Sequence, residues 1–359
     1  MTQSEQNLHS GRQWHLDLLR ILAIFTIVLI HVSPQGYLKV NVRSGEWTVM
    51  NLITCLSCWN VPVFYMISGA LFLGKKRNQP VRELYGKSIL RIVTCFLFWS
   101  AFYGAYYCFM TGKGKWTFLN QLLRGHYHMW FMFVILGLYW VTPLIRQMTA
   151  SRKATEYFLI AGLVLTYGTT RLLFLLQHLP IGHADVLASL VSLNAQINPY
   201  RALNALYYFV LGYYLNETVS TRGQKTGCIL LGAAGFLLLT ALTAWDSARQ
   251  GTTSSDFNSD ASIGTLLYTL GMFVLFKSLC TGWQPSGKIR SVITALSSWT
   301  FGIYLCHPFI LERLQPNFNP TSPAALLAQI LGATVLVYVL ALGVSALIHR
   351  IPIAKKYIV

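Results

Sequence analysis

Charged side chains are scarce in this sequence. Only 11% of its 359 residues are Asp, Glu, Lys or Arg, whereas a soluble globular domain carries about 25%. In addition, 54% of the residues are hydrophobic, and the mean hydropathy is +0.49. These values exclude an ordinary soluble domain and predict an all-α, polytopic protein that is embedded in the lipid bilayer.

Acidic residues are rarer still. The chain has 11 Asp and Glu against 28 Lys and Arg, which gives a formal net charge of +17. Such an excess also occurs in nucleic-acid-binding proteins. In a membrane protein, however, basic residues retain loops in the cytoplasm and contact anionic lipid. We therefore expect no nucleic-acid partner.

Signals for metal binding and for processing are also missing. Cys55 and Cys58 form a C-x-x-C pattern, but it lies in an apolar segment without a second pair. This pattern predicts packing, and we expect no metal site. The first apolar segment lacks a small-residue cleavage site and is expected to be a retained membrane span.

Long apolar segments dominate what is present. We expect a cytoplasmic tail at 1–13, a transmembrane domain at 14–349 and a second cytoplasmic tail at 350–359. The domain is predicted to have ten spans: 14–33, 50–73, 88–110, 127–147, 157–176, 199–216, 227–245, 262–281, 292–312 and 323–349. Basic residues concentrate in alternate loops, most densely at 74–87, which predicts that both termini are cytoplasmic.

The first predicted span carries Asp17, Arg20 and His31 on one helical stripe. Arg20 and His31 lie about 60° and about 40° round from Asp17, and His31 is roughly 16 Å along the axis from Arg20. An ionisable residue inside a membrane helix is costly and usually marks a functional site. The alternatives are an interfacial ion pair for Asp17 and Arg20, and a histidine bonded to a neighbouring helix for His31.

Polar residues in two further spans have structural alternatives. Ser68 precedes Gly69 in the second span, and this pair favours close helix packing over a serine nucleophile. Arg91 opens the third span, where it is either a snorkelling anchor or a ligand for a phosphate group.

The fourth and ninth spans supply the remaining candidates. His126 and His128 are two residues apart, so on one helix they would face opposite sides and be poor joint metal ligands. Trp130 fits an interfacial aromatic belt. In the ninth span, Tyr304 and His307 share a face beside a proline that kinks the helix. The predicted orientation places His307 at a depth similar to that of His31 and places His126 and His128 near the outer surface, which implies a polar chamber that opens outward.

Five short motifs occur in order along the chain. They are Leu16-Asp17-x-x-Arg20 followed by His31, Val61-Pro62-x-Phe64-x-x-x-Ser68-Gly69, Ser88-Ile89-Leu90-Arg91, His128-x-Trp130-Phe131, and Gly302-Ile303-Tyr304-x-x-His307-Pro308. Together they resemble the membrane acyltransferase-3 family. The arrangement is particularly similar to the branch that O-acetylates the enterobacterial common antigen.

This resemblance implies a multi-pass O-acetyltransferase of the bacterial inner membrane. Acetyl-CoA would be a donor substrate from the cytoplasm rather than a bound cofactor, and the acceptor would be a hydroxyl of a periplasmic or cell-surface carbohydrate. The catalytic residues would be His31, as general base or in an acetyl relay, with Asp17 orienting Arg20. Arg20 and Arg91 would bind the donor's phosphates. The other expected substrate-binding residues are Ser68, His128, Trp130, Tyr304 and His307.

Two other classes use the same residues differently. The intramembrane His, Arg and Asp could form the pathway of a proton-coupled transporter, although no half-to-half similarity is visible. A membrane scaffold would tolerate their replacement. The sequence makes no prediction of oligomeric state.

Overall fold

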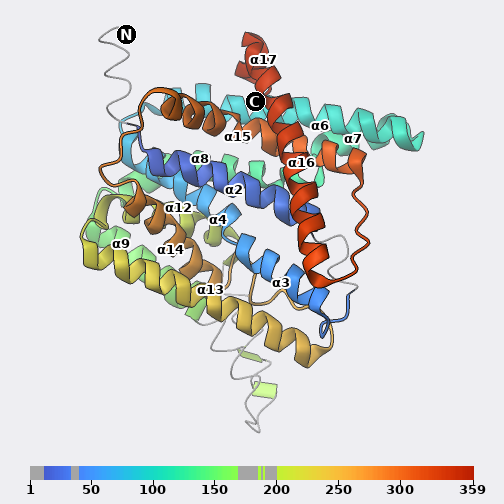
Figure 1. Ribbon diagram of the computed structural model, residues 1–359. Helices are drawn as coiled ribbons and strands as arrows, with labels where there is room; N and C mark the ends of the chain where they lie inside the picture. The colour runs from blue at the N-terminus through green and yellow to red at the C-terminus, as the bar shows by residue number, and fades with distance from the viewer. Residues whose placement is uncertain (1–11, 34–39, 169–184, 187–188, 191–199) are drawn as a thin grey trace.

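The computed structural model describes residues 12–33, 40–168, 185–186, 189–190 and 200–359, and it is built from helices (Figure 1). No β-strand occurs in these ranges. The main helices are α2 (Trp14–Val32), α3 (Gly45–Ser57), α4 (Asn60–Gly69), α6 (Leu90–Thr111), α8 (Trp130–Met148), α9 (Arg152–Gly162), α12 (Tyr200–Thr218), α13 (Arg222–Gln250), α14 (Ile263–Leu279), α15 (Gly287–Leu314) and α16 (Pro323–Arg350).

Short elements connect them. These are the helices α5 (Val81–Glu83), α7 (Lys115–Arg124) and α17 (Pro352–Tyr357), the π-helical turns η3 (Ala70–Lys75), η4 (Leu84–Ile89) and η6 (Leu163–Gly168), and the 3₁₀ turn η5 (Tyr127–Met129).

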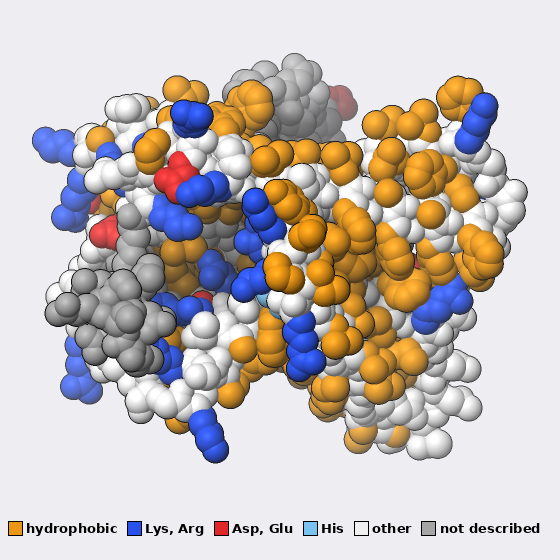
Figure 2. Space-filling view, turned by 90° about the horizontal axis from the view of Figure 1, so that it is seen from above, with side chains coloured by type: hydrophobic (Ala, Val, Ile, Leu, Met, Phe, Trp, Pro, Cys, Tyr) orange, Lys and Arg blue, Asp and Glu red, His pale blue; other side chains and the backbone are white. Residues whose placement is uncertain are grey.

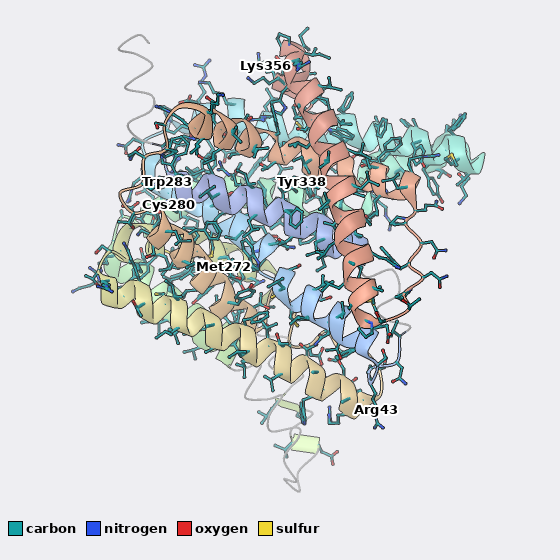
Figure 3. The ribbon with its side chains drawn as sticks, in the orientation of Figure 1. Arg43, Met272, Cys280, Trp283, Tyr338 and Lys356 are labelled. Carbon is teal, nitrogen blue, oxygen red and sulfur yellow. The ribbon has the colours of Figure 1, made fainter. Side chains whose placement is uncertain are left out.

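The helical prediction is confirmed, and helices lie at the predicted spans as far as the described residues reach. The end of the fifth predicted span, 169–176, and most of the predicted tail, 1–11, lie outside the described residues. Six helical segments in the described ranges are long and apolar enough to cross a bilayer, and α14 is apolar but shorter. The predicted loops after the first span and before the ninth lie at opposite ends of the bundle, as Arg43 and Trp283 show (Figure 3). The count of ten spans and the cytoplasmic termini stay predictions.

Helix α2 is the central element. It packs against α3, α4, α14, α15 and α16. Leu19, Ala23, Ile24 and Val28 are buried in it. Apolar contact surrounds this helix over most of its length, so any polar group on it must find a partner inside the protein or in a cavity.

The second predicted span is broken rather than continuous. Helix α3 ends at Ser57 and α4 begins at Asn60. The break lies just before Pro62, which cannot donate the hydrogen bond that would tie it to the turn before it.

Glycine lets α4 and α12 cross in backbone contact. A Cβ atom on Gly69 would lie 1.6 Å from the carbonyl oxygen of Phe209, and one on Gly212 would lie 2.2 Å from that of Met66. The close approach expected at Ser68-Gly69 is therefore confirmed, and it follows the small-residue rule for membrane helices. A similar crossing joins α13 to α14 at Gly232 and Gly271.

Candidate active site

A cavity of about 800 Å³ connects most of the predicted site residues. Basic side chains line one part of it: Arg20, Lys76, Lys87, Arg91 and Lys355. Aromatic and histidine side chains line another part: His31, Phe64, His128, Trp130, Phe131 and Tyr304. Lys and Arg side chains gather mainly in the half of the molecule where α2 and α15 begin, whereas hydrophobic side chains dominate the other half (Figure 2).

Asp17 joins α2 to α15. The residue is 4% exposed, and its Oδ1 accepts a 2.6 Å hydrogen bond from the Ser297 hydroxyl. Oδ2 accepts a 2.6 Å bond from Arg12 Nε. The predicted pair with Arg20 is present at 3.6 Å, so it is the longest of the three contacts. Asp17 therefore holds the helix end while Arg20 lines the cavity.

Arg91 has a backbone partner. Its Nε and Nη2 donate to the carbonyl oxygen of Val359 at 3.0 and 2.7 Å, while the residue also lines the cavity. The side chain thus fixes the segment after α17 against α6. Its role toward a phosphate stays a prediction.

Arg146 fixes the loop that brings Lys76 to the cavity. This buried guanidinium donates to the carbonyl oxygens of Phe72, Lys76 and Gln79 at 3.1, 2.7 and 2.7 Å. Desolvation, together with the nearby Arg20 cation, lowers the pKa of Lys76 below its ordinary value. Sequence reasoning missed Arg146, since an arginine in the last turn of a span is indistinguishable from an interfacial anchor.

His31 is paired with His307 across α2 and α15. Nδ1 of His31 lies 2.8 Å from Nε2 of His307, and the two rings are stacked with centroids 5.1 Å apart. Nδ1 of His307 lies 3.0 Å from the carbonyl oxygen of Ile303. His31 lines the cavity.

These partners decide which ring nitrogens carry protons. The Ile303 carbonyl can only accept, so His307 donates from Nδ1 and, as a neutral ring, has a lone pair on Nε2. His31 must then donate from Nδ1, which leaves the lone pair on its Nε2. A histidine held in this tautomer has the free nitrogen that a general base or a nucleophile requires.

His126 and His128 also meet. Their Nδ1 atoms are 3.0 Å apart, and Nε2 of His126 lies 3.0 Å from a carboxylate oxygen of Glu312. The expectation that they face opposite sides is wrong, because His126 precedes the 3₁₀ turn η5 in extended backbone and neither residue belongs to α8. Sequence reasoning missed Glu312, which is adjacent to an arginine at the end of a span and resembles an ordinary interfacial charge.

His128 presents an unpaired nitrogen. The residue is 2% exposed and lines the cavity, and its Nε2 has no hydrogen-bond partner among the described residues. The Tyr304 hydroxyl donates a 2.5 Å bond to the His128 carbonyl oxygen and so fixes the turn. A buried, unsatisfied imidazole nitrogen is costly unless a ligand engages it.

The other predicted residues also border the cavity. Ser68 and Trp130 line it, and Trp130 is in addition largely exposed, as an aromatic-belt residue would be. In the described part of the chain, no group of three or more His, Cys, Asp and Glu has an arrangement that would hold a metal ion.

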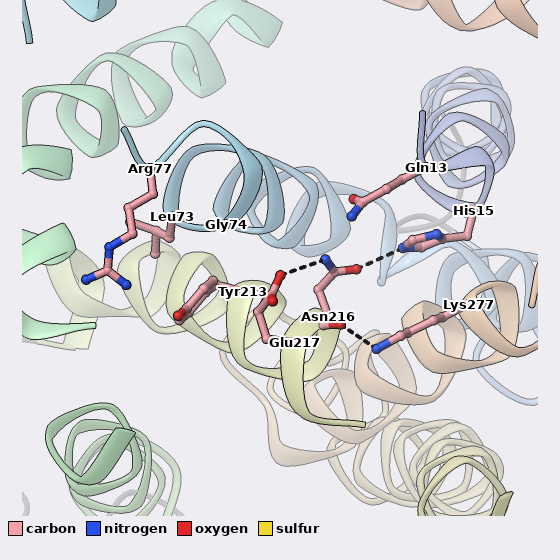
Figure 4. Close-up of a pocket in the computed structure, with 9 residues that line it drawn as sticks. All are labelled: Gln13, His15, Leu73, Gly74, Arg77, Tyr213, Asn216, Glu217 and Lys277. Atoms are coloured by element: carbon pink, nitrogen blue, oxygen red, sulfur yellow. Dashed lines mark hydrogen bonds between the residues drawn. The ribbon is translucent and has the colours of Figure 1, made fainter. Parts of the chain in front are cut away.

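A second cavity of about 600 Å³ is lined by residues from α2, η3, α12 and α14 (Figure 4). Its polar groups bind one another. His15 Nε2 lies 3.0 Å from Asn216 Oδ1, Asn216 Nδ2 donates to Glu217, and Lys277 donates to the Asn216 carbonyl. These bonds make it a structural polar network, whereas His31 and His128 line the larger cavity.

Comparison with known proteins identifies relatives across most of the chain. Residues 14–350 match the acyltransferase domain of the acyltransferase-3 family. Probable poly-beta-1,6-N-acetyl-D-glucosamine export proteins of Staphylococcus aureus strains MSSA476 and MRSA252 are each 21% identical over 314 residues, which is 83% of this chain and 82% of the relative. No solved structure matches the chain significantly.

Proposed function

Since this chain belongs to the acyltransferase-3 family and is an acyltransferase, we propose that it moves an acetyl group from acetyl-CoA to a carbohydrate hydroxyl. The observation that carries the proposal is the cavity, which is lined both by a cluster of basic side chains and by His31. The acyltransferase family also supports placing this apolar, helical protein in a membrane, for which we propose the bacterial inner membrane.

The charges of the cavity suit a CoA thioester. Its nucleotide is multiply anionic, and Arg20, Lys76 and Arg91 provide cations where α2 begins. His31 is roughly 16 Å farther along α2 by helix rise. An extended pantetheine arm would span this distance along the cavity, past Phe64. The nucleotide would then stay on the donor side while the thioester reaches His31.

At His31 two routes are chemically available. Its Nε2 can remove the proton of the acceptor hydroxyl, or it can receive the acetyl group and pass it on. In both routes His307 acts as a positioning residue, because its Nε2 accepts the Nδ1 proton of His31 and so keeps the lone pair of His31 on Nε2.

A polysaccharide is the acceptor class we propose. The name of the Staphylococcus aureus relatives refers to poly-β-1,6-N-acetylglucosamine, and the motif arrangement favours a glycan of the enterobacterial-common-antigen type. The same name favours a second candidate function, which is glycan export. Consumption of acetyl-CoA by purified protein with glycan present distinguishes transfer from export.

The direct test compares surface-glycan acetylation by mass spectrometry in cells that lack the gene and in cells complemented with wild type or His31→Ala. We expect acetylation with wild type alone. A His31→Ala protein that acetylates normally at equal membrane abundance would refute the role of His31.

Donor binding has its own test in Arg91→Ala. Loss of charge-assisted phosphate bonds costs about 1.5–3 kcal/mol, or roughly 10- to 150-fold in affinity. Titration of acetyl-CoA into purified wild type and variant should show this loss. Equal affinities would show that Arg91 serves the Val359 segment and not the donor.

A further inference from the structure

The described residues contain two histidine pairs. The pair His31–His307 ends at a backbone carbonyl, whereas the pair His126–His128 ends at the carboxylate of Glu312. We propose, building on the acetyl-transfer function, that His128, His126 and Glu312 carry the proton of the acceptor hydroxyl out of the cavity to the solvent on the acceptor side. The chain runs from the unpaired Nε2 of His128, through the 3.0 Å contact to His126, to the 3.0 Å contact with Glu312.

Hydrogen-bond roles give this chain a direction. An ionised carboxylate only accepts, so His126 donates to Glu312 from Nε2 and, when neutral, accepts at Nδ1. His128 then donates from Nδ1, which leaves the lone pair on its buried Nε2, while the residue itself lines the cavity. A proton that arrives there can move along the chain, because every following contact joins a donor to an acceptor.

The exposure of the chain increases outward. His128 is 2% exposed, whereas the side chains of His126 and Glu312 are 18% and 35% exposed. Ser297 and His307 bond to opposite ends of α2, so Glu312, farther along α15, lies beyond His31 and away from Asp17. The more exposed end of this path therefore lies opposite the basic cluster.

The surroundings leave one group that can take the proton away. Tyr103 of α6 stacks on His126 at 4.1 Å, and the rings of Tyr127 and Tyr304 also contact the histidines. Phenols are neutral near pH 7. His307, whose ring lies 5.7 Å from that of His128, donates its own proton to a carbonyl. Among the described residues that contact these rings, Glu312 is the carboxylate.

In the proposed reaction, His31 carries the acetyl group, and His128, His126 and Glu312 carry the proton. The acetyl carbon bonds to Nε2 of His31 as its bond to sulfur breaks, and the thiolate takes a proton from solvent on the donor side. The acceptor oxygen then bonds to that carbon, its proton passes to Nε2 of His128, and the C–N bond breaks with its electron pair returning to His31. Transfers from His128 to His126 and from His126 to Glu312 release one proton outside, and ring rotation restores the starting tautomers.

This sequence predicts that each acetyl transfer takes up one proton on the donor side and releases one on the acceptor side. A closed test uses inverted membrane vesicles from the native cells, with their glycan and a trapped pH-sensitive dye inside. Labelled acetyl-CoA is added outside, and His31→Ala vesicles give the background. We expect one lumenal proton for each acetyl group that enters the glycan.

Two results would overturn different statements. Glycan labelling without lumenal acidification would show that the proton returns to sulfur, and would refute the exit path alone. No labelling above the His31→Ala background would refute the proposed acetyl transfer, and the exit path with it.

Variants of Glu312 identify the path itself. Because general base catalysis contributes about 10²–10⁴-fold, we expect Glu312→Gln to slow transfer at least tenfold near pH 7 with unchanged acetyl-CoA affinity, and Glu312→Asp to restore most of the rate. Glu46→Gln, which alters a carboxylate at the start of α3, should behave as wild type. A Glu312→Gln enzyme with wild-type rate and proton yield would exclude Glu312.

Discussion

Replacing His307 with leucine should slow acetyl transfer while leaving the affinity for acetyl-CoA unchanged. In the wild type, the 2.8 Å bond from His31 Nδ1 to His307 Nε2 keeps the His31 lone pair on Nε2. Leucine would leave the Nδ1–H group without its acceptor, at a cost of about 1–3 kcal/mol. The imidazole would also distribute between two tautomers, one of which has no lone pair where the reaction occurs.

If this cost falls on the reacting state, the turnover number should decrease roughly 5- to 150-fold. Purified proteins at equal concentration are compared by transfer of labelled acetyl groups and, separately, by acetyl-CoA titration. Glutamine at position 307 should recover much of the rate, because its carbonyl oxygen can accept the same proton. Cys306→Ala is the control for repacking of α15, since its thiol contacts backbone carbonyls and not the histidines.

A His307→Leu enzyme that transfers acetyl groups at the rate of Cys306→Ala would refute the tautomer reasoning. So would a glutamine variant as slow as leucine, because the acceptor atom would then have no effect. A decrease confined to acetyl-CoA affinity would place His307 in donor binding instead.

Three further predictions concern the scaffold and the donor end. Gly69→Ala should destabilise the protein by at least about 1–3 kcal/mol, because its Cβ would overlap a carbonyl oxygen of α12. Thermal unfolding in detergent measures this loss. The control is Gly86→Ala, whose Cβ would meet no atom within 4 Å and whose stability should equal that of the wild type. Because the pKa of Lys76 is lowered, its positive charge is present below that pKa and lost above it. The affinity for acetyl-CoA should therefore decrease at a pH below 10.5, the ordinary pKa of lysine. The Lys76→Arg variant should not show this decrease at alkaline pH. Arg146→Leu should release the 72–79 loop and weaken acetyl-CoA binding about tenfold, corresponding to one lost charged hydrogen bond, as titration would show; unchanged affinity would separate that loop from the donor site.

Much of the fold can be predicted from the sequence because each helix is determined by residues within its own segment. Apolar segments of membrane length predicted helices where the described helices lie, and Gly69 predicted a close crossing. The stripe of Asp17 and His31 on the first span predicted groups that the structure joins to α15. Each of these signals needs only spacing within one segment.

The sequence could not predict which residues these groups bind, for a physical reason. His31 and His307 are 276 residues apart, and nothing in either segment records which helix will lie beside it. His126 and His128 were misplaced by assuming helical geometry one turn too early. Arg146 and Glu312 have the appearance of interfacial charges until the carbonyls and imidazoles that they bind are known.

The separation of 276 residues between the paired histidines also means that the ribosome makes them at different times. At about 5–20 residues per second, a ribosome needs roughly 14–55 s to proceed from His31 to His307. During this interval α2 is already made, with Arg12 and Arg20 available to neutralise Asp17 but without Ser297 or His307. A copy that ends before residue 307 can thus hold its first helix in the membrane while lacking the partner of His31 Nδ1, so the proposed site is complete only after synthesis has passed His307.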